Sequence, residues 1–145
     1  MKIIKQGLLL SLFVGVFFTG CMQNSKQMIL ENQQSLKVRS YQIKKYDKTK
    51  KEVARAIVST LQDLSFIIDK ADMETGTVTA TKLVKGASMR MTLIARKQSK
   101  TSTQVRLNAQ FSGGGNMPEA VTDPETYKAF FTALDKSLFL ESQGI

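Results

Sequence analysis

Histidine is absent from the 145-residue sequence, and cysteine occurs once, at Cys21. Without histidine the chain cannot build an imidazole-based catalytic triad or an imidazole-based metal site. A lone cysteine has no partner for a disulfide within the chain, so packing alone must hold the fold. No Ser–Lys pair stands out by its spacing as a nucleophile with its base. We therefore expect a protein that is not an enzyme and needs no metal or cofactor.

Long hydrophobic runs are also lacking, apart from one near the N-terminus. Residues 7–18 form an apolar run that follows Lys2 and Lys5 and ends in small residues. A run of about 12 residues is too short to span a bilayer core, which needs roughly 20. A basic start, a short apolar run and small residues are typical of a secretory signal peptide. We expect residues 1–20 to be such a signal and the mature chain to lie outside the cytoplasm.

The residues Phe18-Thr19-Gly20-Cys21 resemble the lipobox of bacterial lipoproteins, although that family usually has an aliphatic residue in place of Phe18. The resemblance implies cleavage before Cys21 and acylation of this cysteine, which would anchor the chain to a membrane. Several acyl chains give a stable anchor, whereas one gives only marginal binding. Met22 stands where an aspartate tends to retain enterobacterial lipoproteins at the inner membrane. The resemblance therefore favours the outer membrane, with a periplasmic and a surface-facing orientation both open.

The mature chain divides into a tether and a domain. Residues 21–36 hold the lipidated Cys21 and a segment rich in Gln, Asn and Ser, which favours a flexible tether. Such a tether spans on the order of 20 Å, enough to lift a domain clear of the headgroups. Residues 37–145 have the length of a single compact domain.

Basic residues are concentrated at the start of this domain. Between residues 37 and 55, eight basic side chains face only Asp47 and Glu52. They are Lys37, Arg39, Lys44, Lys45, Lys48, Lys50, Lys51 and Arg55. Such a region attracts anionic lipid headgroups, lipopolysaccharide phosphates or acidic partners. A solvated basic face is the simpler alternative, and nucleic acid is not an expected partner of a secreted, lipidated protein.

Two segments have helical periodicity. Thr49 and Glu52 have the spacing of a capping box at the start of a helix over residues 49–64. Its apolar stripe comprises Val53, Ala54, Ile57, Val58, Leu61 and Leu64. A second helix begins at Asp123-Pro124-Glu125, which supplies an N-cap acceptor and a proline at the first helical position. Its stripe comprises Tyr127, Phe130, Phe131, Leu134 and Leu138, extended by Phe139, and favours core packing over a ligand site.

Alternating apolar and polar residues predict β-strands between the helices. Strands are expected at residues 38–46, 66–69, 77–84, 89–96 and 105–111, the first as an edge strand protected by lysines. Turns are expected at Lys70–Gly76, Lys85–Ala87 and residues 97–102, and a glycine-rich crossing loop at Ser112–Val121. The predicted fold is α+β, a two-layer sandwich with a largely antiparallel sheet of about five strands and two amphipathic helices, in the order β-α-β-β-β-β-α.

The lipobox, the polar tether and the unit KEVARAIVSTLQDLSFIIDKAD…GTVTATK look like small lipoprotein domains of Gram-negative envelopes, including those accessory to the outer-membrane barrel-assembly machinery. In those domains a helix precedes a hairpin whose turn carries acids and a glycine, here Asp69, Asp72, Glu74 and Gly76. The segment DPETYKAFFTALDKSLFLE is similar to the closing helix of uncharacterised envelope lipoproteins. The resemblance implies a helix-grip-like binding module without catalysis.

Two functional hypotheses follow. The first is a membrane-anchored, non-catalytic module that binds another envelope protein for assembly or support. The second is a binder of an anionic envelope or surface ligand, such as lipopolysaccharide, peptidoglycan or a host surface, through the basic region at residues 37–55. The sequence does not indicate the oligomeric state.

Overall fold

The computed structural model describes residues 35–144. By its internal contacts the chain separates into residues 1–35 and a compact unit, Leu36–Ile145, and only the second is described below. The predicted signal peptide, the predicted lipidation site Cys21 and most of the predicted tether lie outside the described residues. The end of that tether, Ser35 and Leu36, belongs to a helix that covers residues 35–42.

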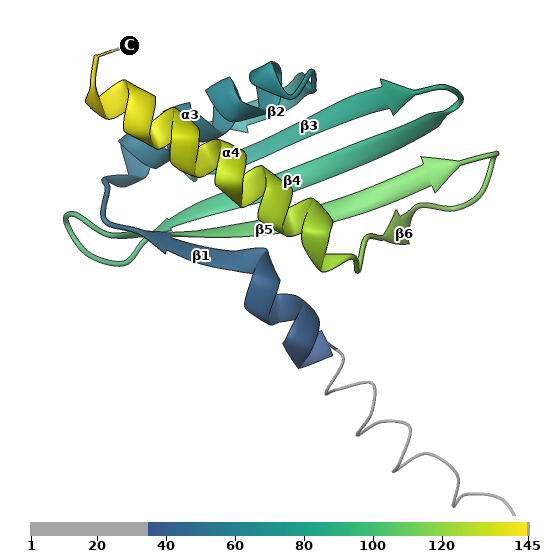
Figure 1. The fold of residues 1–145 in the computed structure, drawn as a ribbon, viewed down its shortest axis with the longest axis horizontal. Coiled ribbons are helices and arrows are strands. Elements are labelled where there is room, and N and C mark those ends of the chain that lie inside the picture. The colour runs from purple at the N-terminus through teal and green to yellow at the C-terminus, as the bar shows by residue number, and fades with distance from the viewer. Residues whose placement is uncertain (1–34, 145) are drawn as a thin grey trace, which may run out of the picture. The chain divides into compact units, whose positions relative to one another are not determined.

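The compact unit is an α+β sandwich with the predicted order of elements (Figure 1). The elements are β1 Ile43–Tyr46, α3 Lys50–Asp63, β2 Ile67–Asp72, β3 Thr77–Val84, β4 Ala87–Lys97, β5 Thr103–Gly113, β6 Glu119–Ala120 and α4 Pro124–Ser142. The sheet order is β1-β5-β4-β3-β2, every pairing is antiparallel, and the short β6 pairs with β5. The predicted fold class is confirmed, and β6 is the strand that the sequence pattern does not indicate.

Helix α3 begins at the predicted capping box. The Thr49 hydroxyl accepts a hydrogen bond from the Glu52 amide at 3.3 Å, and the Glu52 carboxylate accepts one from the Thr49 amide at 2.9 Å. The buried side of the helix consists of Val53, Ala54, Ala56, Ile57, Thr60 and Leu61. Val58 and Leu64, which the stripe included, are only partly buried. The helix therefore turns a slightly different face to the core than the leucine spacing alone indicates.

The predicted strand over residues 38–46 is wrong in its first half, which is helical up to residue 42. Tertiary contacts account for this difference. The Tyr41 ring lies 5.3 Å from the Tyr127 ring, and its hydroxyl donates to the Thr122 carbonyl at 2.6 Å. Buried Gln42 donates to the Tyr127 hydroxyl at 3.3 Å. These partners belong to α4 or the segment just before it, and such contacts override a weak local strand preference.

The predicted strands β3, β4 and β5 form a meander with a continuous register. In each strand, alternate residues point to the helix layer and are buried. These are Val78, Ala80, Met91, Leu93, Ala95, Val105, Leu107 and Ala109. Their neighbours on the opposite face are polar or partly exposed. The core therefore lies between one face of the sheet and the two helices.

Two chain segments outside the meander differ from their predicted bounds. Strand β2 extends to Asp72, because the Asp72 carboxylate accepts from the amides of Glu74 and Thr75 and the turn starts only there. The predicted crossing loop at Ser112–Val121 is partly sheet. Strand β5 runs on to Gly113, β6 forms, and the Val121 amide donates to the Ala109 carbonyl at 2.9 Å. Backbone pairing with β5 thus extends the sheet into a segment without side-chain alternation.

Helix α4 begins as predicted, with Asp123 as N-cap and Pro124 at its first position. The predicted stripe is buried from Tyr127 to Leu138. Phe139 is the exception, because 64% of its surface is exposed. The inclusion of Phe139 in the core is therefore wrong, and this aromatic side chain remains on the surface.

Candidate functional site

The structure separates the eight basic residues of the predicted anionic contact region. Lys37 and Arg39 lie exposed on the helix over residues 35–42, and Lys51 lies exposed on α3. Within β1, Lys44 pairs with inward-facing Val105 and Lys45 with outward-facing Gln104, so these neighbours point to opposite faces of the sheet. The described residues do not form one continuous basic patch.

The side chains of Lys44 and Lys50 are held by bonds to other elements, Lys44 by Asp135 on α4. The Lys50 ammonium donates to the Glu74 carbonyl in the β2–β3 turn. Lys48 and Arg55, by contrast, meet at a hollow between α3 and the end of α4. These two side chains therefore belong to a different surface from Lys50.

A groove runs along the C-terminal half of α4. It consists of two adjoining hollows of about 420 and 320 Å³, which share Lys48, Leu138 and Ser142 in their walls. We call this surface the α4 groove. Its walls are Tyr46, Asp47, Lys48, Glu52, Arg55, Asp135, Leu138, Phe139, Glu141, Ser142 and Gly144.

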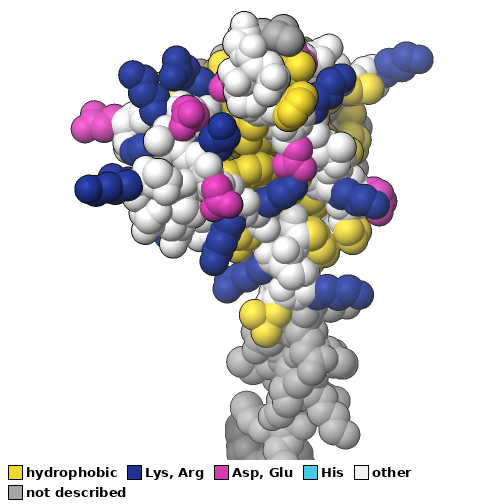
Figure 2. Space-filling model, turned by 60° about the vertical axis from the view of Figure 1, so that its left-hand side comes forward, with side chains coloured by type: hydrophobic (Ala, Val, Ile, Leu, Met, Phe, Trp, Pro, Cys, Tyr) yellow, Lys and Arg dark blue, Asp and Glu magenta, His cyan; other side chains and the backbone are white. Residues whose placement is uncertain are grey.

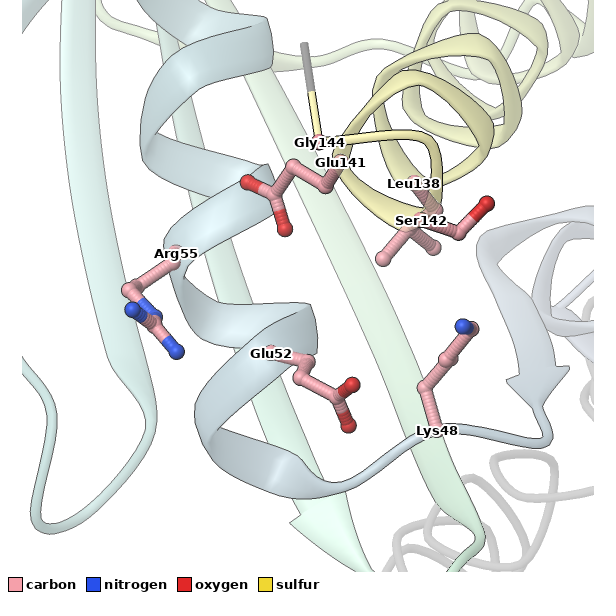
Figure 3. Close-up of a pocket in the computed structure, with 7 residues that line it drawn as sticks. All are labelled: Lys48, Glu52, Arg55, Leu138, Glu141, Ser142 and Gly144. Carbon is pink, nitrogen blue, oxygen red and sulfur yellow. The ribbon is translucent and has the colours of Figure 1, made fainter.

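Three elements build the groove. Arg55 and Glu52 come from the first turns of α3, Leu138 and Glu141 come from α4, and Lys48 comes from the link between β1 and α3 (Figure 3). In Figure 3, Glu141 extends from α4 toward α3, and the Lys48 side chain extends toward the end of α4. The side of the molecule seen in Figure 2 has a strip of hydrophobic side chains with charged side chains around it.

The hydrophobic floor of the groove combines buried and exposed side chains. Leu138 and Tyr46 are 6% and 9% exposed, whereas the neighbouring Phe139 is 64% exposed. The Tyr46 hydroxyl is buried and makes no hydrogen bond of ordinary geometry. Burial, together with the nearby Asp135 carboxylate, raises the pKa of Tyr46 well above its ordinary value. The Tyr46 hydroxyl therefore stays neutral and closed to solvent beneath the exposed Phe139 side of the groove.

The charged rim of the groove is nearly balanced. Lys44 binds Asp135 at 2.5 and 2.8 Å and lies 5.6 Å from the Tyr46 ring centre. Hydrogen bonds from Thr49, with Lys48 and Arg55 nearby, lower the pKa of Glu52. Around the groove, the basic Lys44, Lys48 and Arg55 thus face the acidic Asp47, Glu52, Asp135 and Glu141. The rim therefore gives the groove no strong electrostatic preference for an anionic or a cationic ligand.

Sequence reasoning identified Lys44, Lys48 and Arg55 but missed Tyr46 and Phe139 as surface features. The available signal was the stripe of α4, in which Phe139 follows Leu138 directly. At about 100° per residue, Leu138 lies near the centre of the buried stripe, and Phe139 lies about 100° further round the helix, outside the arc that the other stripe residues occupy. Tyr46 carried no comparable signal, because its burial depends on α4, far along the chain.

The acidic turn after β2 does not form a metal site in the structure. Asp72 accepts from the turn amides, which lower its pKa, and Asp69 accepts from the Thr81 hydroxyl at 2.6 Å. Among residues 35–144, no group of three or more His, Cys, Asp or Glu side chains is arranged to hold a metal ion. Within the same range, no helix combines the length and apolar character needed to cross a membrane.

No protein-family model matches the sequence, and no curated protein is significantly similar to it. Among solved structures, the chain is similar to the crystal structure of a DUF4468 family protein from Bacteroides ovatus. The TM-score is 0.45 and the sequence identity 6%, over 66% of this chain and 84% of that chain. A likeness this distant carries no argument about function.

Proposed function

We propose that this protein is a lipid-anchored, non-catalytic binding module of the bacterial cell envelope, and that its partner is another envelope protein. The anchor follows from the lipobox-like residues before Cys21, and Met22 favours the outer membrane. The absence of histidine and the assignment of the single cysteine to the lipid support a role in binding. The α4 groove is the surface that we assign to the partner.

One observation carries the choice of a protein partner: the α4 groove has an apolar floor inside a charge-balanced rim. Exposed aromatic residues next to well-packed apolar ones are typical of the centre of protein interfaces, and polar groups typically surround that centre. An anion site would instead need an excess of basic groups. The separation of the eight basic residues therefore disfavours the alternative of an anionic ligand bound through residues 37–55.

The partner segment that fits this groove carries an apolar side chain. This side chain would lie against Leu138 and Phe139. Lys48 and Glu141 would pair with charges at the edge of such a segment. Burying Phe139 in this contact removes apolar surface from water, which stabilises the complex.

Site-specific photocrosslinking in cells that make the protein tests the partner assignment. A photoreactive phenylalanine analogue replaces Phe139 in one variant and Met117 in another, because Met117 is 85% exposed and lies outside the groove. We expect a discrete protein adduct from position 139 only, weakened by Lys48→Glu. The same adduct from both positions, or none from position 139, would rule out the groove as the interface.

The anchor needs a separate test. Metabolic labelling with an alkyne-bearing fatty acid should mark the wild-type chain in the membrane fraction. The Cys21→Ser variant should lose the label and leave the membrane fraction after a high-salt wash, which removes electrostatic contacts but not an acyl anchor. A Cys21→Ser chain that keeps both label and location would contradict the assignment of this cysteine.

A further inference from the structure

Within residues 36–144, no element covers the face of the sheet opposite the helices. Residues that alternate with the buried ones in β3, β4 and β5 point to this face, and none of them is buried. We call it the open sheet face. In the view of Figure 1 both helices lie in front of the sheet, and the open sheet face is turned away.

Basic residues on this face come together across three strands. Lys45, Gln104 and Arg96 lie side by side in one cross-strand row of β1, β5 and β4. Arg106 follows two positions further along β5 and points to the same face. Cross-strand and diagonal neighbours in a sheet are within reach of long side chains. Lys45, Arg96 and Arg106 therefore surround Gln104.

Acidic residues do not balance this cluster. Strands β1, β4 and β5 contain no aspartate or glutamate. Among residues 35–144, the ion pair on this face joins Arg90 to Asp69 at 3.9 Å, and both lie apart from the cluster. Arg106 lies diagonal to both Lys45 and Arg96, within reach of long side chains, so the three like charges repel one another. An anionic surface outside the chain would remove this repulsion.

Exposed apolar residues lie on the same face, toward the other end of the strands and the β2 edge, with Leu83 in the row of Ser88, eight positions along β4 from Arg96. Leu83 pairs with Ser88 and Ile67 pairs with Thr81, so both point to the open sheet face. They are 72% and 66% exposed. A surface that joins exposed apolar side chains to lysines and arginines is typical of proteins that lie on a membrane interface.

We propose that the open sheet face docks on a bilayer surface rich in anionic phospholipid. Lys45, Arg96 and Arg106 contact the lipid phosphates, and Leu83 and Ile67 enter the interface. A soluble phosphate could contact the same three cations, but it would leave Leu83 and Ile67 in water, whereas a membrane interface takes up apolar side chains.

This docking goes beyond the proposed function, since the α4 groove lies on the helix side of the sheet. It also does not depend on acylation. The test therefore uses a chain that starts at Met22 and has no lipid, so that a wrong anchor assignment and a wrong docking face give different results. This chain contains the whole compact unit Leu36–Ile145, and circular dichroism melts confirm that each variant folds.

Vesicle flotation measures the charge contribution. The vesicles hold phosphatidylethanolamine and phosphatidylglycerol in a 7:3 ratio (roughly one-third anionic lipid), and phosphatidylcholine vesicles are the neutral reference. The triple variant Lys45→Gln, Arg96→Gln, Arg106→Gln should lose on the order of 100-fold in partitioning, from the typical contribution of each basic residue near an anionic surface. A matched triple variant on the helix layer is Lys51→Gln, Arg55→Gln, Lys136→Gln, whose three residues are also exposed. It should lose much less.

Fluorescence then locates the surface that enters the lipid. Because the sequence contains no tryptophan, a Leu83→Trp variant carries a single reporter on the open sheet face. A Phe139→Trp variant carries one in the α4 groove. Anionic vesicles should shift the emission of the Leu83→Trp variant to shorter wavelength and leave that of the Phe139→Trp variant unchanged.

Three results would each overturn the proposal. The first is that the wild-type chain does not bind anionic vesicles at low salt. The second is that both triple variants weaken binding equally, which would indicate a response to net charge alone. The third is that the emission shift occurs in the Phe139→Trp variant and not in the Leu83→Trp variant. A loss confined to the sheet-face triple variant, together with a shift confined to the Leu83→Trp variant, supports the docking face.

Discussion

The turn between β2 and β3 depends on a glycine that no other residue can replace without strain. Gly76 has a φ of +77°, and a Cβ atom placed there would lie less than 3.0 Å from the Ala95 carbonyl oxygen. The Gly76 carbonyl accepts from the buried Ala95 amide at 2.8 Å, which holds the turn against the end of β4. A Gly76→Ala substitution must therefore move the backbone and break this hydrogen bond.

Gly86 offers a matched control, because its φ is +79° and a Cβ atom there would meet no atom within 4 Å. Gly86→Ala carries only the cost of a left-handed conformation, about 1–2 kcal/mol. Gly76→Ala adds the loss of a hydrogen bond to a buried amide, about 1–3 kcal/mol more.

Urea unfolding followed by circular dichroism measures both free energies of unfolding. We expect Gly76→Ala to be the less stable variant by about 1–3 kcal/mol, with an unchanged dependence on urea concentration. Equal losses in the two variants would refute the argument, because they would show that the approach to Ala95 has no energetic consequence.

Three further predictions concern single side chains. Tyr46→Phe should leave the free energy of unfolding unchanged or raise it by up to about 1 kcal/mol, since the hydroxyl makes no ordinary hydrogen bond; a clear loss would reveal a partner. Phe139→Ser should change that free energy by less than about 0.5 kcal/mol, whereas buried Leu138→Ala should cost about 2–5 kcal/mol, both in urea titrations. Hydrogen bonds from Thr126 lower the pKa of Asp123. The ionised Asp123 carboxylate therefore stabilises the folded state fully above the ordinary aspartate pKa of about 4, and this stabilisation is lost as the pH falls through the lowered pKa of the folded state. Asp123→Asn should therefore narrow the difference in urea midpoint between pH 7 and pH 3, and an unchanged difference would contradict this.

Local patterns predicted most of the fold because the decisive signals lie within a few residues of each other. Strand β3 has the predicted bounds, since alternating Val78 and Ala80 are bounded by a glycine turn on either side. The capping box at Thr49 and the N-cap at Asp123 are likewise local. Residues 38–42 were misjudged because their conformation depends on Tyr127 and Thr122, which lie more than 80 positions away.

The candidate site was less accessible to sequence reasoning. The basic residues from 37 to 55 are close in sequence, but strand alternation sends Lys44 and Lys45 to opposite faces. Lys44 then meets Asp135 on α4, 91 positions away. The basic cluster on the open sheet face joins Lys45 to Arg96 and Arg106, which only the strand order brings together. The run of basic residues along the chain therefore predicted neither the α4 groove nor the basic cluster on the open sheet face.

The attachment of the N-terminal helix to the start of α4 has a mechanical consequence. A chain held at its N-terminus carries any load through residues 35–42, and the Tyr41 hydroxyl bond to Thr122 and the contact of Gln42 with Tyr127 are on that path. The load passes into α4 near its first turn, while the α4 groove lies along the second half of the same helix. Under the proposed anchor, tension on the N-terminal segment would therefore act on the same helix that forms a wall of the α4 groove.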